Sequence, residues 1–208
     1  TVTDEHGNNS EPVTAKIVIE KPLAINIEGV SDGQKSNHDL TISVGVLDGT
    51  IQKIELNQVA ITENPFVVTK EGNYTLKVTT KSDTDAENVR TITFSIDKTP
   101  PVAILGTSRT FYINEETVIS GGLSIDNMGI AEYVWNIEGD PTEYKGMILR
   151  KVFTEAKEHN IYLRVRDNHG NWSQEAATLK IQVQYRPVEV NFIDILNIND
   201  GQKINQDV

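Results

Sequence analysis

The chain has 208 residues, 38% of them apolar, and a formal net charge of −11 at neutral pH. This apolar fraction suits one large or two modest folded domains and argues against wholesale disorder. The acidic residues are spread out with no basic half, which disfavours nucleic acid and anionic lipid as partners. The absence of cysteine excludes disulfides, thiolate zinc sites and cysteine nucleophiles. No apolar run is long enough to cross a bilayer, so we expect a soluble excerpt of a longer protein, with no membrane insertion of this segment.

The first segment, residues 1–21, begins with a motif that recurs late in the chain. The ten residues from Val2 to Glu11 match those from Val165 to Gln174 at six positions, with an offset of 163. A second pair of segments, 31–40 and 199–208, also matches at six of ten positions, with an offset of 168. These offsets indicate a repeating unit of two domains, so residues 1–21 are expected to be the terminal strands of a preceding domain.

Residues 22–98 form the first complete predicted domain. Apolar residues alternate with polar ones in the runs 40–46, 74–79 and 92–96. A period of two is the signature of a strand with one buried and one solvated face. Glycine-containing turns such as Asp32-Gly33 and Asp48-Gly49 separate the runs, because glycine supplies the positive φ angles that tight turns need.

Residues 99–185 form the second predicted domain, with the same alternation in the runs 133–137, 161–165 and 177–183. A Gly121-Gly122 turn and the turn from Asp167 to Asn171 separate its strands. Many short strands with frequent turns predict an all-β chain, built as tandem immunoglobulin-like antiparallel β-sandwiches.

Prolines mark the domain boundaries at Pro22, Pro100-Pro101 and Pro187, and each follows a basic residue. These residues are Lys21, Lys98 and Arg186. The intervals from Pro22 to Pro100 and from Pro100 to Pro187 are 78 and 87 residues, each the size of a small sandwich domain. Because proline restricts its own φ and the residue before it, the joints are predicted to be short and stiff. Residues 186–208 are expected to be the first strands of a following repeat.

The run Thr91-Ile92-Thr93-Phe94-Ser95-Ile96-Asp97-Lys98-Thr99-Pro100-Pro101 resembles the ending of bacterial immunoglobulin-like surface repeats. The stretch from Glu71 to Thr80 is similar to the penultimate strand of those repeats. In the second domain, the run from Tyr133 to Asp140 and the ending from Ile161 to Asp167 resemble PKD-like domains. Both resemblances imply β-sandwiches on a bacterial cell surface or in a secreted protein, with neighbouring repeats of the same chain as partners.

Calcium is the most plausible ion, because carboxylates in loops supply the hard oxygen ligands that it prefers. Asp97, Asp126 and Asp140 are the candidate metal ligands, with Glu138 beside them. Scattered acidic residues are the competing interpretation, since the chain has thirty of them. No other cofactor is indicated.

The aromatic and histidine residues have plain structural interpretations as well as functional ones. Trp135 alternates with polar residues and is expected in the core, whereas Trp172 beside a turn is the candidate ligand-binding aromatic. Arg164 and Arg166 share one strand face and suggest either a basic strip for an acidic partner or ordinary solvated charges. His6 and His169 occupy equivalent turns, in which the Asp is expected to bond its own backbone.

These observations indicate no enzyme, because no catalytic constellation stands out. The preferred hypothesis is a non-catalytic structural stalk that projects adhesive or catalytic domains of the parent protein. The alternatives are a binding module for a polysaccharide or a surface protein, and an accessory module of a secreted hydrolase.

Overall fold

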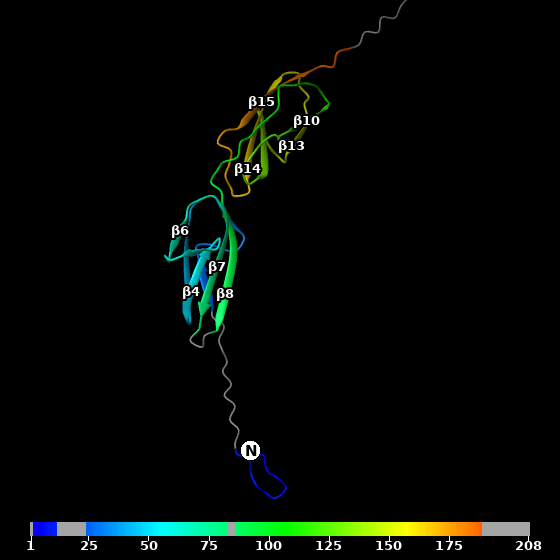
Figure 1. Cartoon of the computed structure of the whole chain (residues 1–208). Helices are drawn as coiled ribbons and strands as arrows, with labels where there is room; N and C mark the ends of the chain where they lie inside the picture. The colour runs from blue at the N-terminus through cyan, green and yellow to red at the C-terminus, as the bar shows by residue number, and fades with distance from the viewer. Residues whose placement is uncertain (1, 12–23, 83–85, 189–208) are drawn as a thin grey trace, which may run out of the picture. The chain divides into compact units, whose positions relative to one another are not determined.

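The computed structural model describes residues 2–11, 24–82 and 86–188, and contains strands but no helix there. It divides into two units, residues 1–99 with 168–171, and residues 100–167 with 172–208. Figure 1 shows the strands of both units. The terminal strands expected in residues 12–21, and those expected from residue 189 onward, lie outside the described residues. No described segment is a helix long and apolar enough to span a membrane.

The first unit contains a sandwich of eight strands. Its strands are β1 (Ile25–Glu28), β2 (Gln34–Ser36), β3 (Leu40–Val46), β4 (Thr50–Leu56), β5 (Val59–Ile61), β6 (Phe66–Val68), β7 (Gly72–Lys81) and β8 (Glu87–Ile96). One sheet has the order β1-β3-β6, and the other has the order β2-β8-β7-β4-β5. All neighbours are antiparallel except β2 and β8, which run parallel.

The second unit contains a sandwich of seven described strands. They are β9 (Thr110–Tyr112), β10 (Glu116–Ser120), β11 (Ile130–Ile137), β12 (Asp140–Lys145), β13 (Ile148–Val152), β14 (Glu158–Asp167) and β15 (Ala177–Gln184). The sheets have the orders β10-β13 and β12-β11-β14-β15-β9, and only β9 and β15, the first and last of its described strands, pair in parallel.

Both sandwiches follow the path of an immunoglobulin-like fold. In the first, the chain crosses between sheets from β3 to β4, from β5 to β6 and from β6 to β7. In the second, the equivalent crossings join β10 to β11, β12 to β13 and β13 to β14. These Greek-key crossings, with short turns and alternating burial, define tandem immunoglobulin-like β-sandwiches.

The predicted alternation is confirmed by burial. The inward residues of each run are buried, and their polar neighbours face outward. The first core includes Ile42, Leu76, Val78 and Ile96, all completely buried. The second core centres on Trp135, which is also completely buried, as predicted for the tryptophan of the equivalent immunoglobulin strand.

Tyr74 near the start of β7 adds a further mark of this fold. Its hydroxyl donates a hydrogen bond of 2.6 Å to the carbonyl oxygen of Lys70, four residues upstream. Its ring stacks on Phe94, with ring centroids 5.1 Å apart. A tyrosine that bonds back across this corner stabilises the crossing between the two sheets.

The glycines at predicted turns divide into two kinds. Gly33 and Gly49 have φ angles of 74° and 93°, as expected for turn glycines. Gly121 does not have a positive φ angle. A Cβ at Gly121 would lie 2.8 Å from Leu163 Cδ2 and 3.0 Å from Tyr133 Cδ1, so this position needs glycine for close packing rather than for its turn angle.

Candidate functional site

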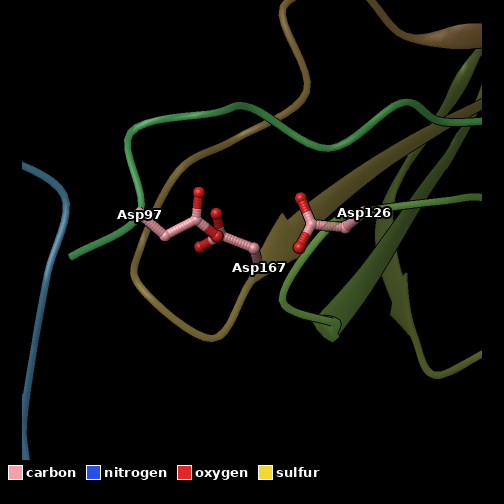
Figure 2. A group of neighbouring side chains, drawn as sticks. All are labelled: Asp97, Asp126 and Asp167. Carbon is pink, nitrogen blue, oxygen red and sulfur yellow. The ribbon is translucent and has the colours of Figure 1, made fainter. Parts of the chain in front are cut away.

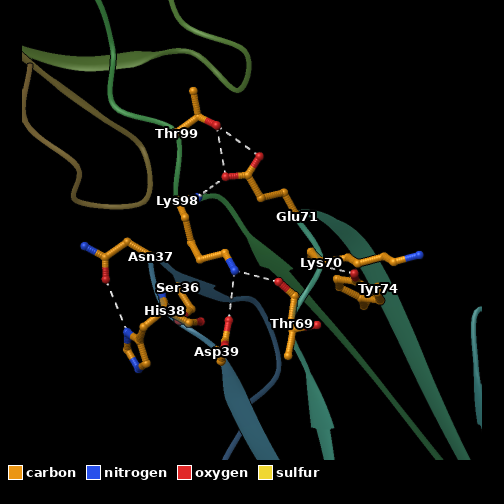
Figure 3. A network of polar contacts seen from close by, with 10 residues as sticks. All are labelled: Ser36, Asn37, His38, Asp39, Thr69, Lys70, Glu71, Tyr74, Lys98 and Thr99. Carbon is orange, nitrogen blue, oxygen red and sulfur yellow. Dashed lines mark hydrogen bonds and ion pairs between the residues drawn. The ribbon is translucent and has the colours of Figure 1, made fainter.

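The chain leaves the first sandwich through Lys98 and Thr99, and both residues are bonded to that sandwich (Figure 3). The backbone N–H of Lys98 donates to Glu71 Oε1 at 2.7 Å, and the Thr99 hydroxyl donates to both oxygens of the same carboxylate at 3.0 Å. Lys98 Nζ donates to Asp39 Oδ1 at 2.9 Å and to the carbonyl oxygen of Thr69 at 2.7 Å. These bonds fix the direction in which the chain leaves its own sheets.

The second sandwich has a comparable arrangement at its exit. Arg186 Nε donates to Glu115 Oε1 at 2.9 Å, and its guanidinium lies 4.8 Å from the centroid of the Tyr112 ring. The Tyr112 ring lies on β9, and Glu115 lies in the turn after it. The basic residues noted before Pro100 and Pro187 therefore act as anchors, although the sequence does not indicate which side chains receive them.

Residues 168–171 group with the first unit, although they follow β14 in the chain. His169 Nε2 lies 2.7 Å from Ser95 Oγ in a buried hydrogen bond, and Asn171 Nδ2 donates to the carbonyl oxygen of Asp97 at 2.8 Å. Ser95 faces away from the core residues Phe94 and Ile96, yet it is only 8% exposed. The imidazole of His169 therefore packs on the outward face of β8, beside Ser95.

Sequence analysis assigned His169 to an ordinary turn and missed this contact. The turn itself is present, because Gly170 has a φ of 98°. The missing information is tertiary: Ser95 lies 74 positions earlier, and a serine on the outward face of a strand carries no signal of a buried partner. The available hint was that the sequence Asp-x-His-Gly-Asn occurs twice, at residues 4–8 and 167–171.

Ser95, His169 and Asp97 are the three residue types of a hydrolase triad, with the histidine between the serine and the aspartate. His169 Nδ1 lies 3.7 Å from Asp97 Oδ2, which is longer than a hydrogen bond. Ser95 and His169 are only 8% and 9% exposed, so a substrate carbonyl has no approach to the serine oxygen. The arrangement holds a turn in place and offers no accessible nucleophile.

Two aspartates of the second unit lie close together. Figure 2 shows Asp126 and Asp167, which each offer one carboxylate oxygen within 4.8 Å of the other, and it also labels Asp97 of the first unit. Asp97 and Asp167 are completely buried, and Asp126 is half-buried. Asp97 and Asp126 were both predicted as ligands from the sequence, whereas Asp167 was assigned only to a turn. Carboxylate oxygens of this kind suit a hard divalent cation, which would need further oxygen ligands to reach six to eight.

Asp140, the third predicted ligand, is placed in a different environment. Its Oδ2 accepts hydrogen bonds from the Tyr144 hydroxyl at 2.7 Å and from Lys151 Nζ at 2.9 Å. The Tyr144 hydroxyl, followed by the ammonium of Lys151, holds the pKa of Asp140 far below its usual range. This carboxylate already has a cation beside it, so it is not available as a ligand beside Asp126 and Asp167.

Trp172 is 37% exposed, in contrast to the buried Trp135. The guanidinium carbons of Arg164 and Arg166 lie 5.1 Å and 5.6 Å from the centroid of its ring. Arg166 also donates from Nε and Nη2 to Glu132 Oε2, at 3.0 Å and 2.8 Å. This bond, and then one from Lys145, lowers the pKa of Glu132. Arg166 is thus held against the sheet by Glu132, whereas Trp172 and Arg164 are exposed to solvent.

No family model matches the chain, and no curated protein matches it. Solved structures with related folds include fibronectin(III)-like modules of Clostridium thermocellum CbhA, 16% identical over 41% of this chain and 100% of that chain, with a TM-score of 0.32. The Ig1-2 module of the Drosophila receptor protein tyrosine phosphatase DLAR is 10% identical over 77% of this chain and 98% of that chain, with a TM-score of 0.33. A Bacteroides ovatus protein of a mixed-linkage glucan utilization locus, solved with a heptasaccharide, is 14% identical over 76% of this chain and 47% of that chain, with a TM-score of 0.28. At these values the assignment of the fold rests on the strand order itself.

Proposed function

We propose that the chain is a non-catalytic spacer segment of a repetitive bacterial cell-surface or secreted protein, which holds adhesive or catalytic domains at a distance. The observation that carries this proposal is the anchoring of each exit, by Glu71 at Lys98 and by Glu115 at Arg186. A spacer needs a defined direction at every joint, and side chains bonded to the departing residues supply one. Proline at positions 100, 101 and 187 adds stiffness to the same segments.

The path of the chain through each sandwich supports the same function. In each sandwich an early strand, β2 or β9, runs parallel to the last strand, so the chain enters at one end and leaves at the other. At about 3.3 Å per residue, strands of about ten residues give each sandwich a length of roughly 30–40 Å. Two sandwiches in series would therefore span about 70 Å.

Spin labels test this proposal directly, because the chain has no native cysteine. Labels at Glu87→Cys and Glu138→Cys would mark the entry end of the first sandwich and the exit end of the second. We expect a narrow distance distribution centred near about 60–70 Å. A distribution centred below about 40 Å, or one spread over most of the accessible range, would refute a fixed spacer.

The contribution of the anchor is tested in the same labelled chain. Glu71→Gln removes the charge that Lys98 and Thr99 engage and is expected to broaden the distribution. Glu63→Gln, at an exposed carboxylate elsewhere on the first sandwich, is the matched control and is expected to leave the width unchanged.

A binding module is the second candidate, and the exposure of Trp172 favours it. An exposed indole beside Arg164 suits a polysaccharide, or a surface protein with acidic groups. The chain could equally be an accessory module of a secreted hydrolase that uses this surface. A binding screen against plant, host and bacterial-wall polysaccharides and matrix proteins tests this candidate. Trp172→Ala is expected to abolish any hit with little change in melting temperature, and an unchanged affinity would remove Trp172 from the site.

Calcium binding is proposed for Asp126 and Asp167, which belong to the same unit. Calorimetric titration of the chain with Ca²⁺ should show saturable binding that Asp126→Asn weakens. The control is Asp39→Asn, because Asp39 is an exposed carboxylate that is bonded to Lys98. Absence of heat and of any melting shift on adding Ca²⁺ would leave the two carboxylates as turn residues.

A further inference from the structure

Two short hairpins in this chain are built alike although 163 positions separate them. The earlier one comprises residues 2–10 and the later one residues 165–173. In the earlier hairpin, Ser10 N donates to the Val2 carbonyl at 2.8 Å and Val2 N donates to Ser10 Oγ at 2.9 Å. In the later one, the equivalent bonds join Ser173 and Val165 at 2.8 Å and 3.3 Å.

The turns inside the two hairpins also correspond. Each contains one isolated bridge, Thr3 to Asn9 or Arg166 to Trp172. The glycines at the tips, Gly7 and Gly170, have φ angles of 84° and 98°. The repeat detected in the sequence is therefore a repeat of backbone structure.

The two turns differ in what their polar side chains contact. In the later hairpin, His169 and Asn171 bond to Ser95 and to the carbonyl of Asp97. In the earlier one, the equivalent His6 and Asn8 are exposed.

The earlier turn is held in shape by its own aspartate. Asp4 accepts bonds from the backbone N–H groups of His6 and Asn8 at 2.9 Å, and from Asn8 Nδ2 at 3.0 Å. The bond from the Asn8 backbone is the first of the causes that lower the pKa of Asp4, so this turn is maintained by a charged acceptor at neutral pH. The imidazole of His6 consequently projects from a turn that is already folded.

The surface that receives the later turn is specific in shape and chemistry. Ser95 offers a hydroxyl that is only 8% exposed, and the carbonyl of Asp97 lies at the end of the same strand. Asn37 Nδ2 would be 3.7 Å from a Cβ at Gly170, so the tip of the turn passes close to this side chain. A turn with a larger residue at the glycine position would be strained by its positive φ as well.

We infer that residues 2–10 are a second copy of this docking turn, and that His6 and Asn8 bind the Ser95–Asp97 end of a sandwich of the same kind. The partner is a repeat sandwich whose last strand ends in Ser-x-Asp, of which the first sandwich of this chain is the available example. Each two-domain unit would then carry one such turn and one such receiving strand end. This inference rests on the proposed spacer function, because it specifies how neighbouring repeats recognise one another.

A peptide titration tests the inference. The host is the ¹⁵N-labelled full chain carrying His169→Ala and Asn171→Ala, which removes the resident side chains from Ser95 and Asp97. The probe is a synthetic peptide of residues 1–11. We expect saturable shifts of the amide signals of Ser95 and Asp97, and binding at least about tenfold weaker for the His6→Ala peptide, the loss expected for one buried hydrogen bond and its packing. If the double variant loses its dispersed spectrum, His169→Ala alone serves as host.

The unmodified chain is the occupied control, and its Ser95 signal should not respond to the peptide. No shift in the variant host at up to about 10 mM peptide, above the millimolar effective concentrations of short tethers, would overturn the inference. Equal shifts with the His6→Ala peptide would also overturn it. The spin-label distances are independent of this titration, so a failed titration leaves the spacer proposal intact. A broad distance distribution would remove the spacer without affecting the titration.

Discussion

In the first sandwich, the central strands β7 and β8 pack a stacked Tyr74 and Phe94 at one edge of an aliphatic core. In the second, the interior strand β11 carries the buried Trp135 of the core, and its Nε1 donates to the carbonyl of Gly146 at 2.7 Å. Apart from β1, which has no counterpart among the described strands of the second sandwich, the strand order is the same in both. The difference teaches that this topology tolerates either many aliphatic residues or one large aromatic at its centre, provided that the polar atom of the aromatic side chain has a partner.

The largest expected effect comes from removing the central aromatic of the second sandwich. Trp135→Ala should destabilise that sandwich by about 3–5 kcal/mol, because it leaves a large cavity. Trp172→Ala is the matched control, and loss of its partly exposed contacts should cost at most about 1 kcal/mol. Both tryptophans lie in the second unit, so denaturant unfolding is followed by circular dichroism, with residual tryptophan fluorescence as a second probe. Equal costs for the two variants would contradict the assigned core.

Gly121→Ala tests how tightly the core is packed around Trp135. The added methyl group would clash with Leu163 and Tyr133, so the second sandwich should lose about 1–3 kcal/mol. Gly45→Ala, on β3 of the first sandwich, has no atom within 4 Å of the new Cβ and should be nearly neutral. The comparison is made from denaturant midpoints, and a neutral Gly121→Ala would show that the core around Trp135 can adjust.

Tyr74→Phe is the corresponding test in the first sandwich. It keeps the stack on Phe94 and removes only the bond to the Lys70 carbonyl, so the expected loss is about 1 kcal/mol. Tyr185→Phe, at a side chain that is 72% exposed, is the control and should not change the midpoint. If Tyr74→Phe left the stability of the first sandwich unchanged, the corner bond would have no net value there.

Acid should act on each sandwich through carboxylates whose pKa is lowered in the fold, and one of these carboxylates is tested in each sandwich. The pKa of Asp140 is lowered by Tyr144 and Lys151, and that of Asp32 by the backbone and hydroxyl of Thr93. A lowered folded-state pKa stabilises the fold above the unfolded value near 4, and this stability is lost as the pH falls through the folded value. Asp140→Asn should therefore make the melting temperature of the second sandwich alone less dependent on pH, and Asp32→Asn that of the first, in thermal melts between about pH 2 and 6. An identical pH dependence of the melting temperature in the variants and the unmodified chain would contradict both assignments.

The long strands could be predicted from sequence because their alternation is regular. β3, β14 and β15 follow from apolar residues at every second position, and their burial agrees. The three-residue strands β2, β5, β6 and β9 could not be predicted in this way, because three residues carry too little periodicity. Their pairing is decided by neighbouring strands distant in sequence.

The candidate sites were predictable only in part, for a related reason. Asp97 and Asp126 were selected for their chemistry and their loop positions, but the same chemistry also selected Asp140, which Lys151 already neutralises. The role of Gly121 depends on Leu163, a residue 42 positions later. Such contacts depend on which faces meet in three dimensions, and the local pattern does not contain that information.

The parallel pairing of β2 with β8 and of β9 with β15 has a consequence under mechanical load. Tension on the two ends of the second sandwich would pull β9 against β15 along the strand axes in opposite directions, and in the first sandwich β2 would be pulled against β8 in the same way once the load has passed β1. The hydrogen bonds of these ladders would then be sheared together rather than unzipped one after another, as they would be in a hairpin pulled from its open end. In the first sandwich the bond from Asp97 N to the Ser36 carbonyl extends the sheared ladder to the last residues before the chain leaves. Breaking such a ladder requires several hydrogen bonds to fail at once.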